Sequence, residues 1–308
     1  MFFFNKLAIV NLEASFNVRE AMVTTKVRSV CYFVLSLLLF SFITVSYAAE
    51  GVHASPVVRY SFGVVPQFEQ RKLFSIWRPI LDDLEKRTGF VFDLVGSSSI
   101  SMFEKKYMEG IYDFAYMNPY HILKAHESQG YVPLIRDGGR LLKGVLVVCK
   151  DSNIKDIKEL SNRKVAFPSP NALGASLLMR ADLTQLYGIN VVPFYVKTHS
   201  SVYLNVVKGL ADAGGGVWST LKAQKPEVKK KLRVLYETRP MYPHPISVHP
   251  RVPPEHRQKV QQAFLAMAQT LDGAALLSKV PIKKAVVASM EDYEPMLKWN
   301  LDKFYVEK

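Results

Sequence analysis

One junction in this sequence combines the backbone features that bind anions. Val165–Phe167 has the composition of a short buried strand, and Pro168 and Pro170 prevent the chain from continuing a ladder or entering a helix early. Asn171 is a good N-cap for a helix that starts near Gly174. A strand, loop and helix in this order direct unpaired amide groups and the positive helix end at one spot. The junction therefore suits an oxyanion, although most such junctions are only turns.

Polar and aromatic side chains follow other expected strands and form a second set of candidates. We expect a ligand to touch several of them, because ligand sites in open α/β sheets lie beyond the carboxyl ends of the strands. Each also has a purely structural interpretation, as a helix cap, a first-turn packing residue or a core aromatic. The candidates are Ser98, Ser99, Tyr116, Asn118, Tyr120, His199, Ser200 and Trp218.

The elements that position these residues alternate between strands and helices. Strands expected at Tyr60–Val65 and Phe90–Val95 each lead through a polar loop into a helix, and the pattern repeats after residue 144. Extended segments near Lys143–Val148 and Pro243–Val248 would carry the chain into and out of a second lobe. We therefore predict an α/β fold of two lobes with two hinge crossovers, each lobe a mixed, mostly parallel sheet flanked by helices. Lobe I would comprise residues 49–143 and 246–308, and lobe II residues 144–245.

The first 48 residues have the composition of an export leader. Two basic residues precede the apolar run Val30–Val45, which is followed by small residues ending at Ala48 and Ala49. A run of 16 residues is short for a membrane span, so we expect a signal peptide cleaved near Ala48. Met22 would be a more ordinary start than Met1. The alternative is an uncleaved N-terminal anchor.

Composition limits the other functions. The 308 residues carry a formal charge of +13, which favours anionic partners, and 49% are hydrophobic, as in a globular protein. Cys149 is the only cysteine after the leader, so no intramolecular disulfide is expected. The basic run Lys225–Arg233 lacks interleaved aromatic residues, which argues against nucleic acid. The chain shows no hydrolase, zinc-protease or P-loop motif and no metal-ligand spacing, so we expect no enzyme, cofactor or metal.

An ordered set of short motifs resembles one known family. Over residues 60–305 the chain is similar to the periplasmic substrate-binding proteins of phosphate, phosphite and phosphonate ABC transporters, the PhnD type. The resemblance implies a type II periplasmic-binding fold that closes on a ligand and delivers it to an inner-membrane permease. The matching residues are Gly63–Gln67, Trp77–Leu84, Gly110–Ala115, Asn118–Tyr120, Phe167–Gly174, His199 and Gly209–Ala213.

The resemblance also implies which residues hold the ligand. In that family a Ser-Thr-Ser-Gly run at a helix start, a histidine after the next strand and tyrosines of the first lobe bind the oxyanion. Here Asn171, Ala172 and Leu173 stand at the three hydroxyl positions, Gly174 matches the glycine, and His199 keeps the histidine. Two side-chain donors are therefore missing. Gly214–Gly216 and Trp218 replace the family's acidic or amide residues, which predicts a wider and more aromatic pocket.

We therefore expect a monomeric, periplasmic solute-binding component of an ABC importer, which closes on a small oxyanion such as a phosphonate, phosphate or phosphite. Two alternatives remain within binding proteins. One is a sensor module for a membrane histidine kinase or chemoreceptor, and the other is a binding protein for a larger ligand. An enzyme of the same fold is a third alternative.

Overall fold

The computed structural model describes residues 57–306, and the expected leader and cleavage site near Ala48 lie outside this range. The described chain forms two sheets. The first has the order β11-β4-β10-β3-β1-β2, in which β1 pairs in parallel with β2 and β3. Its strands are β1 (Arg59–Val64), β2 (Val91–Val95), β3 (Phe114–Tyr116), β4 (Val132–Asp137), β10 (Ile246–Val248) and β11 (Ala285–Val287).

The second sheet takes all its strands from the middle of the chain. Its order is β7-β6-β8-β5-β9, with β6 parallel to β7 and β8 and with β5 antiparallel to β8 and β9. The strands are β5 (Gly144–Cys149), β6 (Lys164–Phe167), β7 (Val192–Tyr195), β8 (Ala213–Val217) and β9 (Leu232–Glu237).

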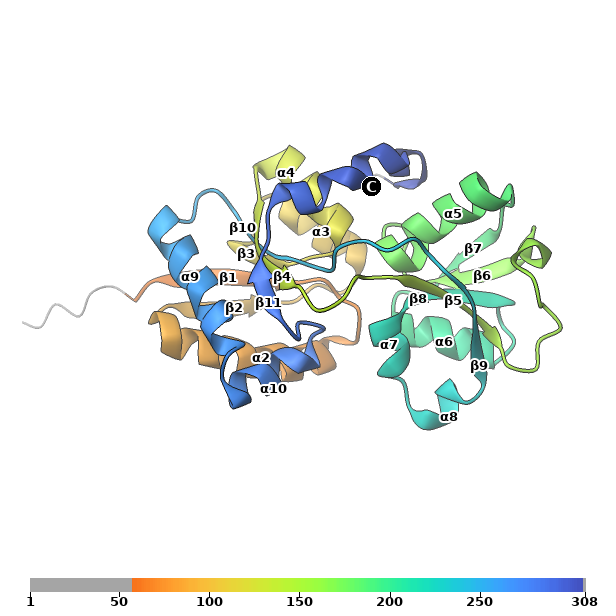
Figure 1. Ribbon diagram of the computed structural model, residues 1–308, viewed down its shortest axis with the longest axis horizontal. Coiled ribbons are helices and arrows are strands. Elements are labelled where there is room, and N and C mark those ends of the chain that lie inside the picture. Colours follow the sequence, from red (N-terminus) through yellow and green to blue (C-terminus); the bar gives the residue numbers. More distant parts are fainter. Residues whose placement is uncertain (1–56, 307–308) are drawn as a thin grey trace, which may run out of the picture. The chain divides into compact units, whose positions relative to one another are not determined.

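Two segments connect the sheets, residues 138–143 on the way out and 238–245 on the return (Figure 1). They pair with each other through an antiparallel bridge between Leu142 and Met241. The returning chain enters the first sheet as β10, which is antiparallel to both β3 and β4. The sheets are mixed, as expected, but parallel pairing does not predominate because β10 and β11 both join the first sheet in the antiparallel sense.

Helices cover both faces of each sheet (Figure 1). Those of the first sheet include α2 (Gln70–Thr88), which ends at Gly89 in the left-handed conformation that favours glycine. None of the helices in residues 57–306 is both long and apolar enough to span a bilayer. The other helices of the first sheet are α3 (Ile100–Met108), α4 (Pro119–Gln129), α9 (Pro254–Met267) and α10 (Leu271–Lys279). Those of the second are α5 (Leu178–Tyr187), α6 (His199–Val207), α7 (Trp218–Lys222) and α8 (Pro226–Lys229).

The largest hydrophobic cluster extends from the first sheet into a helix start of the second. It contains Phe62, Trp77 and Ile100 from the first part of the chain, together with Leu173 and Leu177. Short helical turns after residue 290 also join it, through Met296 and Leu301. The helix start that was expected to bind an anion therefore packs directly against the first sheet's core.

Candidate ligand-binding site

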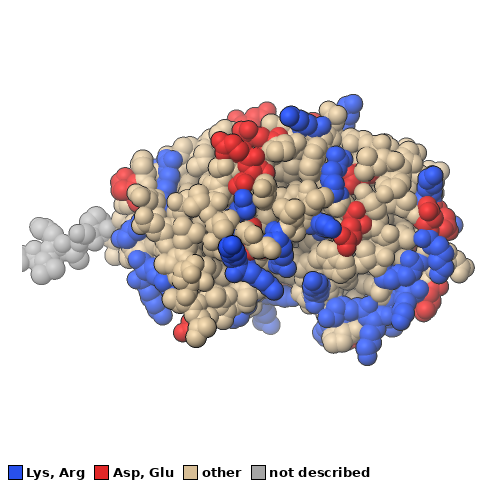
Figure 2. Space-filling view, in the orientation of Figure 1, with Lys and Arg blue, Asp and Glu red and all other residues tan. Residues whose placement is uncertain are grey.

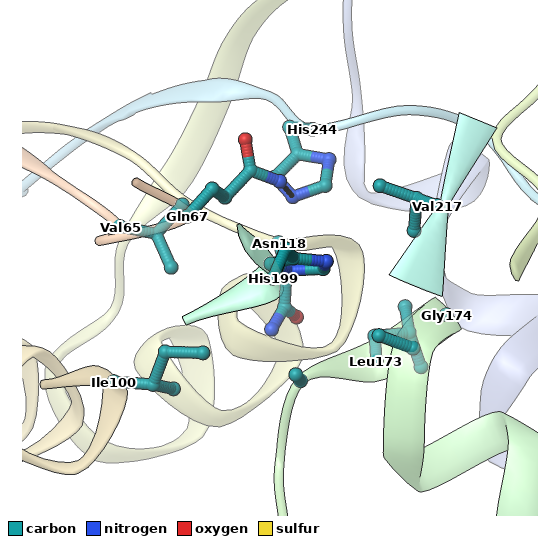
Figure 3. Close-up of a pocket in the computed structure, with 11 residues that line it drawn as sticks. Val65, Gln67, Ile100, Asn118, Leu173, Gly174, His199, Val217 and His244 are labelled. Atoms are coloured by element: carbon teal, nitrogen blue, oxygen red, sulfur yellow. Dashed lines mark hydrogen bonds between the residues drawn. The ribbon is translucent and has the colours of Figure 1, made fainter. Parts of the chain in front are cut away.

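A small cavity lies between the two sheets, at the carboxyl ends of several strands. Its volume is about 20 Å³, roughly the room that one water molecule needs. Figure 3 shows the ring of His244 beside the amide of Gln67, with Leu173, Gly174 and Val217 across from them. The lining residues are Val65, Gln67, Ile100, Asn118, Ala172, Leu173, Gly174, Ala175, His199, Val217 and His244.

The helix start at Leu173 supplies the backbone donors of this site. The chain makes one π-helical turn, Leu173–Leu177, before α5 begins, and Ala172 precedes the turn without a side-chain cap. The first amides of a helix have no intrahelical acceptor. Within residues 57–306, the amides of Leu173, Gly174 and Ala175 have no acceptor, and these three residues line the cavity.

Close backbone packing holds the helix start in place. A Cβ atom added to Gly144 in β5 would lie 1.9 Å from the carbonyl oxygen of Gly174. A Cβ on Gly215 in β8 would lie 1.9 Å from the carbonyl oxygen of Ala175. Gly214–Gly216 therefore lets the strand pack against its neighbours and is not among the residues that line the cavity.

His199 is the buried histidine that the second sheet contributes. It is the first residue of α6, which Thr198 caps by accepting a hydrogen bond from the Ser201 amide at 3.1 Å. His199 Nδ1 lies 3.2 Å from Thr220 Oγ1, and the residue is only 3% exposed. Burial lowers the pKa of His199 from 6.5 to about 4, so the ring is neutral at physiological pH.

His244 faces the cavity from the returning connection. The Gln67 amide donates to His244 Nε2 at 3.1 Å, and the imidazole stacks on the ring of Tyr116 with centroids 5.3 Å apart. Burial, with smaller effects from His121 and His199, lowers the pKa of His244 to about 3. Two neutral imidazoles, one from each side, therefore line one small cavity.

Asn118 joins the first sheet to the helix start. Its Oδ1 accepts from the amides of Tyr120 and His121, both at 2.8 Å, and so caps α4. Its Nδ2 donates to the carbonyl oxygen of Asn171 at 3.2 Å and lies 2.8 Å from His121 Nε2, which is also 3.0 Å from Glu104 Oε1. Asn118 therefore positions the loop that carries the helix start.

No lysine, arginine, aspartate or glutamate lines the cavity. Arg140 and Lys143 line a neighbouring cavity that shares His244. Figure 2 shows other basic side chains gathered on the surface over the part of the second sheet's region that includes α8. That part of the chain carries Lys225, Lys229, Lys230 and Lys231. The net positive charge can attract an anion to the molecule, but inside the cavity hydrogen-bond donors must hold it.

The structure brings five of the twelve predicted contacts together at the cavity and places the others elsewhere. Asn118, Ala172, Leu173, Gly174 and His199 line it. The amide of Asn171 does not, because it bonds to Glu104 Oε2 at 3.2 Å and to the carbonyl oxygen of Val306 at 2.9 Å. The side chain offered as a ligand donor thus binds the C-terminal segment.

The predicted aromatic contacts do not line this cavity, although Trp218 lines a neighbouring one of about 40 Å³ that shares His244. Tyr120 Oη donates to Asp302 at 2.6 Å, and Trp218 Nε1 donates to Glu237 at 3.0 Å. Tyr116 is buried against Trp77 and His244. The wider, more aromatic pocket expected from the glycine run and Trp218 is not what the structure shows, because no phenylalanine, tyrosine or tryptophan lines the cavity.

Two of the three predicted serines make local hydrogen bonds. Ser99 caps α3 by accepting from the Met102 amide at 3.2 Å, and Ser98 is exposed. Ser200 accepts from Gln224 at 3.3 Å. None of the three is a lining residue.

Sequence reasoning missed six lining residues, of which Gln67 and His244 are polar. Val65, Gln67, Ile100 and Val217 all follow or end a strand, so the rule that ligands bind beyond strand ends would have found them. Ala175 directly follows the predicted helix start. His244 lies between two prolines on the return connection, where the sequence carries no comparable signal.

Comparison with known proteins agrees with this architecture. The family described as ABC transporter, phosphonate, periplasmic substrate-binding protein matches residues 62–293. The chain belongs to this family. It is a family of periplasmic substrate-binding components of importers, not of enzymes, and its match spans both sheets.

Solved structures of such proteins share the fold. A binding protein component of an ABC phosphonate transporter from Pseudomonas aeruginosa matches with a TM-score of 0.73 and 15% identity, covering 80% of this chain and 87% of that one. PhnD1 from Prochlorococcus marinus, in complex with methylphosphonate, matches with 0.72 and 15%, covering 80% and 99%. A Xanthomonas citri protein bound to ATP matches with 0.65 and 16%, covering 80% and 98%. The type II periplasmic-binding fold predicted from the sequence is confirmed.

Proposed function

We propose that this substrate-binding protein holds a small oxyanion of the phosphonate, phosphite or phosphate type in the cavity between its sheets and delivers it to an inner-membrane ABC permease. One observation carries the proposal. The unpaired amides of Leu173, Gly174 and Ala175 and the buried ring of His199 face one cavity with Gln67 and His244 of the other side. Amides at a helix start form an anion site without any cationic side chain.

Ligand entry requires the two sides to move apart, because the cavity of about 20 Å³ has room for little more than one water. Residues 138–143 and 238–245 connect the sheets and would act as the hinge. Shifting such an equilibrium from mostly open to mostly closed takes about 5.5 kcal/mol. Two to four charge-assisted hydrogen bonds of about 1.5–3 kcal/mol each supply it.

Two further properties of the protein are its export and its oligomeric state. We infer that the protein is exported with a signal peptide cleaved near Ala48, and that the mature chain works as a monomer. The paired connections already give the binding site both of its walls from one chain. Mass spectrometry of the exported protein tests the cleavage, and light scattering tests the monomer.

A thermal-shift series tests the ligand class directly. The mature protein is heated alone and with phosphate, phosphite, methylphosphonate, sulfate or uncharged glycerol. A ligand at one hundred times its Kd stabilises the folded state by about 2.7 kcal/mol, which raises the Tm of a chain of this size by about 5–10 °C. We expect this rise with at least one phosphorus oxyanion and none with glycerol. No rise with any phosphorus oxyanion, up to millimolar concentration, would contradict the proposal.

A further inference from the structure

Residues 222–231 form a strongly basic surface on the second sheet's region, which we call the lysine face. The segment carries five lysines and one glutamate, a net charge of +4. All five lysines are exposed, and Figure 2 shows basic side chains gathered over α8, which lies in this segment. None of them lines the candidate ligand-binding cavity. The lysine face consists of Lys222, Lys225, Lys229, Lys230 and Lys231.

Buried side chains fix the orientation of the lysine face. Leu221, Val228 and Leu232 belong to a hydrophobic cluster that also contains Val145 and Tyr203. The lysines between these anchors therefore project to the solvent. Pro226 is the first residue of α8, where its fixed backbone angle suits a helix start. The charges are thus presented by a packed part of the fold.

No carboxylate neutralises the lysine face within residues 57–306. The ion pairs of the second sheet's region join other residues, namely Lys143 to Glu237, Arg163 to Asp212 and Arg239 to Asp182. Lys229 Nζ donates to the carbonyl oxygen of Lys222 at 3.3 Å, and Lys222 Nζ lies 5.4 Å from the centre of the Trp218 ring. Like charges gathered on one surface repel each other, and an anionic partner relieves this repulsion.

The composition of this surface distinguishes between anionic partners. Between residues 218 and 233 no large hydrophobic side chain is exposed, and Arg233 donates to the carbonyl oxygens of Ser152 and Ile154. The cores of protein interfaces are enriched in aromatic residues and arginine and depleted in lysine. A layer of lipid phosphates requires neither, because it attracts lysines as point charges close to its surface. The lysine face therefore suits a membrane surface better than an acidic protein.

We propose that the lysine face docks the protein on anionic lipid headgroups of the inner membrane. The chain belongs to a family of periplasmic substrate-binding components of ABC transporters, whose permeases lie in that membrane. Attraction to the headgroups keeps the protein at the surface where delivery takes place. The contact is electrostatic and reversible, because α8 has only four residues and its valine is buried. Docking at this face does not depend on which ligand the cavity holds.

Vesicle co-sedimentation tests the docking. The exported protein is mixed with vesicles of phosphatidylcholine alone, and with vesicles of equal parts phosphatidylcholine and phosphatidylglycerol. We expect binding to the anionic vesicles only. Raising the salt concentration from about 0.05 M to about 0.5 M should weaken this binding at least about tenfold, because salt screens exposed charges.

Two triple variants with the same loss of charge locate the effect. Lys229→Gln/Lys230→Gln/Lys231→Gln removes three charges of the lysine face. Each lysine close to an anionic surface strengthens binding about fivefold, so this variant should bind at least about 20-fold more weakly. The matched control is Lys279→Gln/Lys283→Gln/Lys284→Gln, which removes three exposed lysines of the first sheet's region and should stay within about threefold of the unmodified protein. Tm values show that each variant is folded.

Several results would overturn the docking. They are no binding to the anionic vesicles, equal binding to both kinds of vesicle, and equal binding by the two triple variants. Tighter binding to polyglutamate than to the anionic vesicles would also overturn it, since an acidic protein would then be the better partner. Neither variant should change the rise in Tm caused by a phosphorus oxyanion, because none of the six lysines lines the cavity. The proposed function therefore stands or falls by its own test.

Discussion

Asn171 and Val306 hold each other through two reciprocal hydrogen bonds. The amide Nδ2 of Asn171 donates to the carbonyl oxygen of Val306 at 2.9 Å, and the Val306 N–H donates to Asn171 Oδ1, also at 2.9 Å. Arg180 reinforces the contact by donating to the carbonyl oxygens of Phe304 and Pro170. The C-terminal segment is therefore attached to the loop that precedes the candidate anion-binding helix.

Replacing Asn171 tests this attachment. Asn171→Ala removes both bonds to Val306 and the bond to Glu104, which is buried, so we expect a loss of about 2–4 kcal/mol in the free energy of unfolding. Asn171→Ser, which restores a hydroxyl typical of the family, should lose nearly as much because the shorter side chain cannot reach both groups. Urea denaturation measures the change. A Ser variant as stable as the unmodified protein would show that the attachment contributes little.

Variants of Asn118 distinguish its two roles, which are to cap α4 and to donate a hydrogen bond to the Asn171 carbonyl oxygen. Serine caps helices nearly as well as asparagine, so Asn118→Ser keeps the cap of α4 but loses the Nδ2 donor to Asn171. We expect Asn118→Ser to cost about 1–2 kcal/mol in unfolding free energy, and Asn118→Ala about 1 kcal/mol more. If denaturation curves of the Ser variant and the unmodified protein coincide, the Asn118–Asn171 bond has no net stabilising effect.

Stability of the ligand-free protein should fall as the pH falls below 6.5. Burial depresses the pKa of His199 to about 4 and that of His244 to about 3, so between these values and 6.5 the unfolded chain binds more protons than the folded one. Each histidine thus contributes stability above pH 6.5 and loses about 2 kcal/mol of it by pH 5. His199→Asn should remove one of these contributions. The same pH dependence in the variant and the unmodified protein, measured by urea denaturation at pH 7.5 and 5, would refute the assignment.

Gly144 marks the place where two backbones meet. Gly144→Ala would put a methyl group 1.9 Å from the Gly174 carbonyl oxygen, so β5 and the helix start must separate. We expect a loss of more than 2 kcal/mol in stability together with weaker oxyanion binding. Gly139→Ala is the matched control, since its Cβ would meet only side-chain atoms, at 3.3 Å or more. Equal Tm values for both variants would mean that the helix start tolerates displacement.

The fold was readable from local signals. Strands followed by polar loops and capped helices predicted α/β lobes, and α2 ends at Gly89 as expected. The sequence does not predict the proportion of parallel pairing, because β10 and β11 pair in the antiparallel sense with strands more than 100 residues earlier in the chain. Local patterns do not encode such pairings.

The sequence predicts the residues that line the cavity only where neighbouring residues in the chain determine their position. The amides after Ala172 follow from a helix start, and His199 follows from its position after a strand. Tyr120 and Trp218 do not line the cavity, and their polar atoms bond to Asp302 and Glu237, which only the folded chain brings near. His244 was missed for the same reason, since nothing near it in sequence points to Gln67.

The most direct test of the central claim is the Kd of methylphosphonate, measured by titration calorimetry near pH 6.5 for three proteins. We predict one site per chain in the unmodified protein and an unchanged Kd in His126→Ala, whose imidazole bonds to the Tyr131 carbonyl oxygen away from the cavity. His199→Ala should bind at least about tenfold more weakly, because it removes a buried hydrogen-bond partner from the cavity. A Kd for His199→Ala equal to that of the unmodified protein would place the ligand elsewhere and contradict the account.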